Sequence, residues 1–182
     1  GIAKNWCVKK KVSPNQVRYV EKGKTQQIGD FTVTPFAVPH DSSDCVGYCV
    51  QCEGITFTLV TDCGHVTEEI CAFVAKANYL VIEANHEVEK LMAGPYPLYL
   101  KERITSQIGH LSNAECARTI VENATENLKH VWLCHLSDEN NHPELARIAV
   151  TSLMESYGLR AGVDFIVEVL RRKIPSEIYD LK

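Results

Sequence analysis

The chain has 182 residues, of which 45% are hydrophobic, and its 19 basic and 23 acidic side chains leave a formal net charge of −4. It contains no run of about 18 apolar residues that could cross a bilayer and no apolar signal core, and its hydrophobic content is too high for a disordered chain. These features predict one soluble unit over residues 1–182, without an internal linker or a membrane attachment and cytoplasmic by default.

The chain begins with a basic segment. Residues 1–24 carry seven basic side chains and one acid (7 − 1 = +6), which leaves 12 − 22 = −10 for residues 25–182. Such a segment can contact phosphate, but most charged runs form a solvated surface. Both interpretations stay open from the sequence alone.

The first predicted elements are β-strands. Residues 28–38 alternate in hydrophobicity and form the first predicted strand. Residues 45–52 and 55–61 are rich in β-branched and aromatic side chains, and the Glu53-Gly54 pair between them is a two-residue hairpin signal.

Helices and strands then alternate. Thr67 can cap a helix over residues 67–77, and Ser112 with Glu115 forms a capping box for a helix to about Asn127. Pro143 suits the first position of a further helix to about Tyr157. Short apolar strands are predicted at 79–82, 130–134 and 164–170, and a loop at 94–97. This order predicts an α/β layered domain.

The eight cysteines do not form an evident framework of disulfides. Most of them lie in apolar stretches, where free cysteine behaves as a small hydrophobic residue, so we expect reduced thiols. Cys49 and Cys52 have the spacing of a zinc knuckle, but no second pair with that spacing follows.

Polar side chains follow the predicted buried strands, at the point where each strand ends. His40 follows the first strand, Asp62 the third, Glu83 the fourth and His135 the fifth. Because the carboxyl ends of strands in an α/β sheet form the ligand-binding crevice, we expect these side chains to converge. Imidazole and carboxylate together favour a divalent metal such as zinc, manganese or iron.

His110 is placed differently, because it comes just before the capping box at Ser112. The N–H groups and dipole of a helix N-terminus favour anions such as phosphate. A histidine at that position can bind a phosphoryl oxygen or protonate a leaving group, and Glu83 could orient it.

These motifs resemble the latter half of a metallo-β-lactamase-fold hydrolase, and more narrowly its YycJ/WalJ group. The resemblance extends from about residue 26 to the end of the chain. The motifs that carry the wider resemblance are Val38-Pro39-His40, Thr61-Asp62, Glu83, residues 109–113 and residues 133–137; those that carry the narrower one are residues 82–86, 94–97, 100–104 and 140–143.

The resemblance implies an αββα sandwich and a set of site residues. His40 and His135 correspond to metal ligands and Asp62 to the aspartate that bridges two ions, zinc or manganese. Glu83 and His110 match an acid and a non-ligand histidine of the members that act on phosphodiesters, so His110, Glu83 and Asp62 are the expected catalytic residues. Neighbouring residues of the same motifs are expected to contact the substrate: Asn85, His86, Ser112 and Asn113.

One defining motif of that superfamily is missing. The H-x-H-x-D-H cluster should precede His40, yet the 39 residues before it contain no histidine. We therefore expect the chain to be the C-terminal portion of a longer protein, with an incomplete N-terminal β-layer and an exposed apolar face. The missing segment or a second copy would cover that face, and this chain alone would bind metal partially or not at all and be inactive.

For the complete protein, the resemblance implies a dinuclear-metal phosphodiesterase or exonuclease that acts on nucleic acid. Two alternatives stay open from the sequence. One is a metallo-hydrolase of small molecules such as a lactone, a thioester or a cyclic phosphodiester. The other is a non-catalytic regulatory module.

Overall fold

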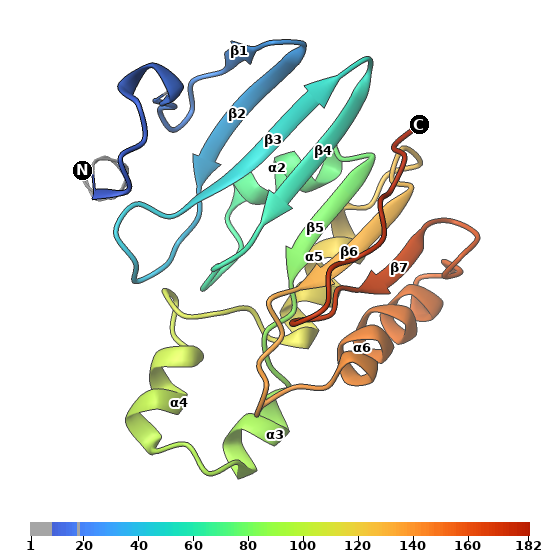
Figure 1. Ribbon diagram of the computed structural model, residues 1–182. Coiled ribbons are helices and arrows are strands. Elements are labelled where there is room, and N and C mark those ends of the chain that lie inside the picture. Colours follow the sequence, from blue (N-terminus) through green and yellow to red (C-terminus); the bar gives the residue numbers. More distant parts are fainter. Residues whose placement is uncertain (1–8, 18) are drawn as a thin grey trace.

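The computed structural model describes residues 9–17 and 19–182 (Figure 1). Two of the seven basic residues counted over residues 1–24, Lys4 and Arg18, and one of the eight cysteines, Cys7, lie outside these residues. The described elements, in chain order, are a 3₁₀ helix Pro14–Gln16, β1 Gln26–Ile28, β2 Phe31–Ala37, β3 Val46–Cys52, β4 Ile55–Val60, α2 Glu68–Ala75, β5 Tyr79–Glu83, α3 Val88–Ala93, α4 Leu98–Ile104, α5 Asn113–Asn123, β6 His130–Cys134, α6 Pro143–Ser156 and β7 Ile166–Val169.

The strands form one seven-stranded sheet whose spatial order is the sequence order, β1 to β7. Neighbours from β1 to β4 are antiparallel, and neighbours from β4 to β7 are parallel. Crossovers between parallel strands are right-handed, which places α2, α5 and α6 on the same face of the sheet (Figure 1). The carboxyl ends of β4, β5 and β6 therefore meet at one edge, and α3 and α4 lie beyond it.

Most predicted elements are confirmed, and local chemistry explains their limits. Glu53 and Gly54 have φ of 49° and 80°, the positive values that a two-residue hairpin turn requires. The Thr67 side chain accepts from the Ile70 N–H, and Ser112 forms both bonds of its capping box with Glu115.

Two predicted boundaries were wrong. The strand predicted over 28–38 is two strands, because Gly29 (φ 59°) starts a tight turn that pairs Ile28 with Phe31. The helix predicted to about Asn127 ends at Asn123, since Ala124 is extended (φ −62°, ψ 134°).

Helices α3 and α4 were not predicted from the sequence. They have six and seven residues, too few for a helical period to stand out. They flank the predicted loop at residues 94–97, and the Lys101 ammonium donates to the Met92 carbonyl across it at 2.6 Å. Tertiary contact thus supports helices that would be marginal in isolation.

The hydrophobic core lies between the sheet and the three helices. Phe36 of β2 stacks on Phe73 of α2, with ring centroids 4.3 Å apart. Leu80 and Ile82 of β5 are fully buried, as predicted for a central strand. This core fixes the strands whose ends carry the polar residues.

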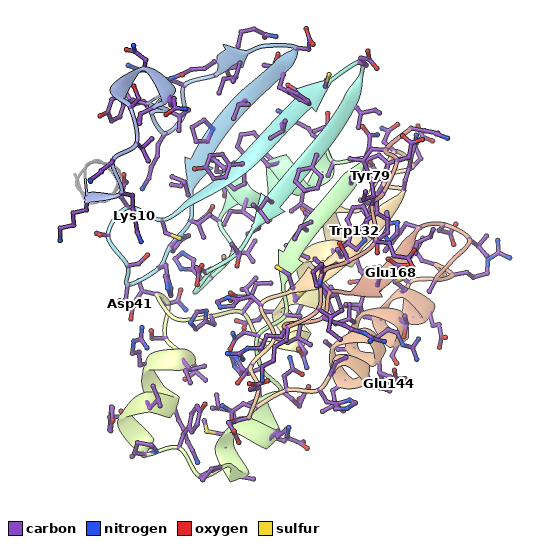
Figure 2. The ribbon with its side chains drawn as sticks, viewed as in Figure 1. Lys10, Asp41, Tyr79, Trp132, Glu144 and Glu168 are labelled. Carbon is purple, nitrogen blue, oxygen red and sulfur yellow. The ribbon has the colours of Figure 1, made fainter. Side chains whose placement is uncertain are left out.

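The opposite face of the sheet carries apolar side chains that are only half-buried. Tyr48, Phe57, Leu59 and Val81 lie on it. The sequence led us to expect an exposed apolar face, and these four side chains are half-buried instead. The C-terminal segment crosses this face in front of β5 and β6 (Figure 1), and Tyr179 of that segment contacts Trp132 and Glu168, which are labelled in Figure 2. In that segment the Tyr179 hydroxyl donates to Glu168 at 2.8 Å.

Two further expectations concern charge and thiols. In the basic segment, Lys22 pairs with Asp44 at 2.7 Å and Lys24 with Glu21 at 2.8 Å, so part of its charge is neutralised locally. All seven cysteines in the described part of the chain are free, as expected.

None of the helices described has the length and apolar run needed to span a bilayer.

Candidate metal centre

Four side chains meet where the parallel strands end. Asp62 follows β4, Glu83 ends β5, His135 follows β6 and His110 lies in the loop before α5. One ligand-type atom from each of the four lies within 4.8 Å of those from the other three. The structure thus brings together residues spread over 74 positions of sequence (135 − 62 + 1 = 74).

Two of these residues have a backbone conformation that is uncommon outside glycine. Asp62 has φ of 53° and His135 has φ of 54°, both in the left-handed region. Asp62 lies two residues after the end of β4 and His135 directly after β6, and both side chains belong to the cluster. Conformations of this kind concentrate at functional sites, where surrounding contacts hold them in place.

His40 reaches the centre from the loop after β2. Its Nδ1 donates to the carbonyl oxygens of Ile108 at 3.1 Å and Gly109 at 2.9 Å. The proton is therefore held on Nδ1, and the lone pair on Nε2 is available to a metal. This Nε2 lies 3.6 Å from Oδ1 of Asp62.

The spacing around Asp62 fits a shared metal ion. Two ligands at about 2.1 Å from one tetrahedral ion are about 3.4 Å apart. Asp62 Oδ1 lies 3.6 Å from His40 Nε2, beyond ordinary hydrogen-bond length and close to this ligand spacing. His135 Nδ1 lies 3.5 Å from the same oxygen, but in this structure it is hydrogen-bonded to Glu83 at 2.5 Å. Two imidazoles and a carboxylate are also a suitable donor set for a divalent metal.

Glu83 is a buried anion at the base of the centre. Its carboxylate accepts from the backbone N–H groups of Asp62 and Leu111, each at 2.9 Å, and contacts Nδ1 of His110 at 3.2 Å and of His135 at 2.5 Å. Burial alone would raise its pKa, but the hydrogen bonds and charges of the two histidines outweigh burial and lower the pKa to about 2. Since Glu83 is 0% exposed, it orients its neighbours and offers no surface to a substrate.

His110 lies between the two histidines proposed as ligands. Its ring centroid is 4.9 Å from that of His40 and 5.2 Å from that of His135. The preceding residue must be small, because a Cβ on Gly109 would lie 2.2 Å from the Ile104 carbonyl oxygen. The backbone N–H of His110 donates to that same carbonyl at 2.9 Å, which fixes the position of the backbone that carries the imidazole.

His135 is the most exposed member of the centre, with 43% of its side chain accessible. The hydrogen bond to Glu83 raises its pKa, burial opposes this, and the charges of Glu83 and Asp62 add to the increase. His135 would bind a metal through Nε2, or through Nδ1 after releasing Glu83.

The four residues expected to contact the substrate are all buried, with exposed fractions of 8% or less. His86 is 1% exposed, Ser112 caps α5, and the Asn113 amide donates to Glu87 at 3.1 Å and to Asn141 at 2.9 Å. Burial lowers the pKa of His86, which favours its neutral form. Asn85 lines a cavity, and its amide donates to the His135 carbonyl at 2.9 Å.

Two features beside the centre were not predicted from the sequence. Arg103 of α4 binds both carboxylate oxygens of Asp41, at 2.5 and 3.0 Å, and lowers the pKa of that carboxyl (Figure 2 labels Asp41). A cavity of about 510 Å³ adjoins His135 and is lined in part by Arg171 and Arg172, which follow β7. Three consecutive basic residues directly after the last strand, 171–173, were the signal that could have revealed it.

Comparison with known proteins supports the interpretation of these motifs. Residues 2–135 match the profile of the β-lactamase superfamily domain. The chain is 35% identical over 156 residues to an exodeoxyribonuclease YycJ of Bacillus anthracis, covering 86% of this chain and 59% of that protein. It is 38% identical over 157 residues to an exodeoxyribonuclease WalJ of Streptococcus pneumoniae, covering 86% and 58%. The chain therefore spans less than two thirds of the length of these relatives.

Solved structures share the fold. The metallo-β-lactamase fold protein YhfI from Bacillus subtilis superposes with a TM-score of 0.60 at 16% identity, covering 84% of this chain and 52% of that one. Zinc-bound PqqB from Methylobacterium extorquens superposes with a TM-score of 0.53 at 18% identity, covering 82% and 49%. The fold class expected from the sequence is thus confirmed.

Proposed function

Because the chain belongs to the β-lactamase superfamily and has the metallo-β-lactamase fold, we propose that its centre hydrolyses phosphodiester bonds of nucleic acid in the full-length protein. The observation that carries this proposal is the pairing of buried Glu83 with His110, directly beside His40, Asp62 and His135. A carboxylate–imidazole pair next to a metal site suits a reaction in which a leaving oxygen needs a proton.

His40, Asp62 and His135 are the residues proposed to hold metal, with zinc and manganese as candidates and Asp62 between two ions. A bound divalent ion would lower the pKa of a coordinated water and neutralise charge on the phosphoryl group. Three protein ligands leave further positions for water, for the substrate and for residues elsewhere in the protein. Partial metal binding and low activity remain our expectation for residues 1–182 alone.

His110 is the proposed catalytic acid. Its Nδ1 faces Glu83 at 3.2 Å, which leaves Nε2 free to face the substrate. A proton on Nε2 can pass to the oxygen that leaves when the phosphodiester bond breaks. The neighbouring N-terminus of α5 also favours the negative charge of a phosphate group.

Glu83 and Asn85 are proposed as positioning residues. Glu83 holds His110 and His135 through its carboxylate and, being buried, does not touch the substrate. Asn85 holds the backbone of His135 and also forms part of the cavity wall. We do not extend a substrate-binding role to His86, Ser112 or Asn113, because each is buried in contacts with the protein itself.

The choice of nucleic acid over other phosphodiesters rests on the relatives. Those reported above are named exodeoxyribonucleases, and their identity with this chain is 35–38%. We therefore propose DNA as the substrate and removal of nucleotides from its ends as the activity. The negative net charge of −4 favours binding at local sites rather than over a broad basic surface.

The test is hydrolysis by the purified full-length protein. Single- and double-stranded DNA, a lactone and a thioester are each supplied with zinc or manganese, and products are followed over time. We expect nucleotide release that depends on metal and falls by about 10²–10⁴-fold in H110A, with metal content unchanged. H142S is the matched control, because His142 is an exposed cap of α6 and serine retains that capping function.

Each other outcome selects a different function. Hydrolysis of the lactone or thioester without hydrolysis of DNA would replace the nuclease by a small-molecule hydrolase. Stable metal binding without hydrolysis of any substrate would favour a non-catalytic module. Nuclease turnover by H110A equal to that of the parent would remove His110 from the mechanism.

A further inference from the structure

A cavity of about 510 Å³ opens beside His135, and neither His40 nor His110 is among its lining residues. We call it the His135 cavity. It is formed where the loop after β6 meets the segment after β7, and the lining residues used below are Asn85, His135, Ser137, Arg171 and Arg172. Its volume is within the usual range for binding sites of small molecules, so it can hold one nucleotide unit.

The charges on the lining suit an anion. Two of the eight lining residues are arginines, and none of the eight is aspartate or glutamate. Lys173 adds a third cation directly along the chain, and Asp138, 3.7 Å from both Lys173 and Arg172, offsets one of the three charges. A concave surface with this balance raises the local concentration of negatively charged ligands.

Arg172 can turn its donors toward a ligand. Its Nη1 lies 3.5 Å from the Leu136 carbonyl and 3.7 Å from the Asp138 carboxylate, distances at or beyond the limit of a hydrogen bond. The guanidinium carries five N–H donors, and its side chain is 56% exposed. Phosphate oxygens would bind it with shorter bonds than either present contact, in the paired geometry that arginine favours.

Ser137 supplies a neutral donor in the same cavity. Its Oγ accepts a hydrogen bond from the Asn140 backbone N–H at 3.1 Å, which leaves the hydroxyl proton for a ligand. The Ser137 backbone is itself fixed, because its N–H donates to the Asn85 carbonyl at 2.8 Å. The cavity therefore combines a rigid hydroxyl with an adjustable cation.

We propose that the His135 cavity binds a backbone phosphate of a DNA strand, one nucleotide away from the bond that is cleaved, through Arg172 and the Ser137 hydroxyl. This inference rests on the proposed function, since it takes the metal centre as the place of cleavage. Arg171 contributes positive charge to the same wall. The site would hold the strand in register so that the correct phosphodiester lies beside His110.

Equilibrium binding tests the cavity separately from cleavage. A fluorescent single-stranded oligonucleotide is titrated with the full-length protein in EDTA, and anisotropy gives Kd over a range of salt concentrations. We expect R172A to raise Kd by about tenfold and to reduce the slope of log K against log salt by about 0.7, because one phosphate contact is lost. R172K should recover part of the affinity, since it restores charge without the paired donors.

R160A is the matched control. Arg160 is an exposed arginine beyond the end of α6 whose partner Asp164 lies 4.0 Å away, and it does not line the cavity. A Kd and salt slope for R172A equal to those of R160A would overturn the proposed subsite. Turnover by the parent protein is measured alongside with metal present. If DNA binds through Arg172 and yet is not cleaved, the proposed function fails while the phosphate site stands.

Discussion

Glu83 offers the sharpest test of the site, because one carboxylate connects Asp62, His110 and His135. In E83Q the side chain keeps its shape but loses its charge and one of its two acceptor oxygens. Oε1 accepts from the Leu111 N–H and Oε2 from the Asp62 N–H, so an amide nitrogen at either position faces a donor. The amide nitrogen would also face Nδ1 of His110 or of His135.

The lost hydrogen bonds and the pKa of Glu83 give the same size for the loss of folding stability in E83Q. A buried donor left without its acceptor costs about 1–3 kcal/mol, so two such groups cost about 3 kcal/mol or more. Separately, a pKa of about 2 in place of 4.5 means that the ionised carboxylate stabilises the folded protein by about 3 kcal/mol at pH 7. Because the folded pKa is the lower one, this contribution is complete above about pH 4.5 and is lost as the pH falls toward 2.

The assay is urea unfolding of the full-length protein at pH 7 and at pH 3. We expect E83Q to lower the free energy of unfolding by about 3 kcal/mol at pH 7 and by less at pH 3, where protonation has already weakened the parent. E155Q, at an exposed position near the end of α6, is the control and should change little. An E83Q protein as stable as the parent at pH 7 would refute the view that Glu83 organises the centre.

Three other predictions concern the metal and the loop that carries His110. In the full-length protein, D62A should abolish stoichiometric metal binding, measured by elemental analysis, because Asp62 faces both His40 and His135. D44A, on an exposed surface, should retain the metal of the parent. Metal affinity should rise between pH 6 and pH 8, because a ligand imidazole must be neutral and Glu83 raises the pKa of His135. Metal binding should therefore release protons, and a calorimetric titration that shows no proton release would contradict this. G109A should destabilise the protein by about 1–3 kcal/mol, since its Cβ would meet the Ile104 carbonyl, and thermal unfolding unchanged from the parent would show that the loop before His110 adapts.

The sequence by itself determined the elements and the region of the site. Alternating strands, the Glu53-Gly54 turn and the two helix caps depend on residues close together in the chain, so their physics is readable locally. The convergence of Asp62, Glu83 and His135 was also predictable, because each follows a buried strand and parallel strands end at a common edge. The short helices α3 and α4 were not predictable, because tertiary contacts rather than local periodicity support them.

Only the tertiary structure decided how those residues are used. It turned Asp62 and His135 into the left-handed region, where they face one another, and it buried Glu83 completely beneath the two histidines. It also brought Arg172, 37 residues beyond His135 (172 − 135 = 37), to the cavity beside that histidine. Burial, pKa and ligand spacing arise from groups that are distant in the sequence, so they are defined only once the sheet has assembled.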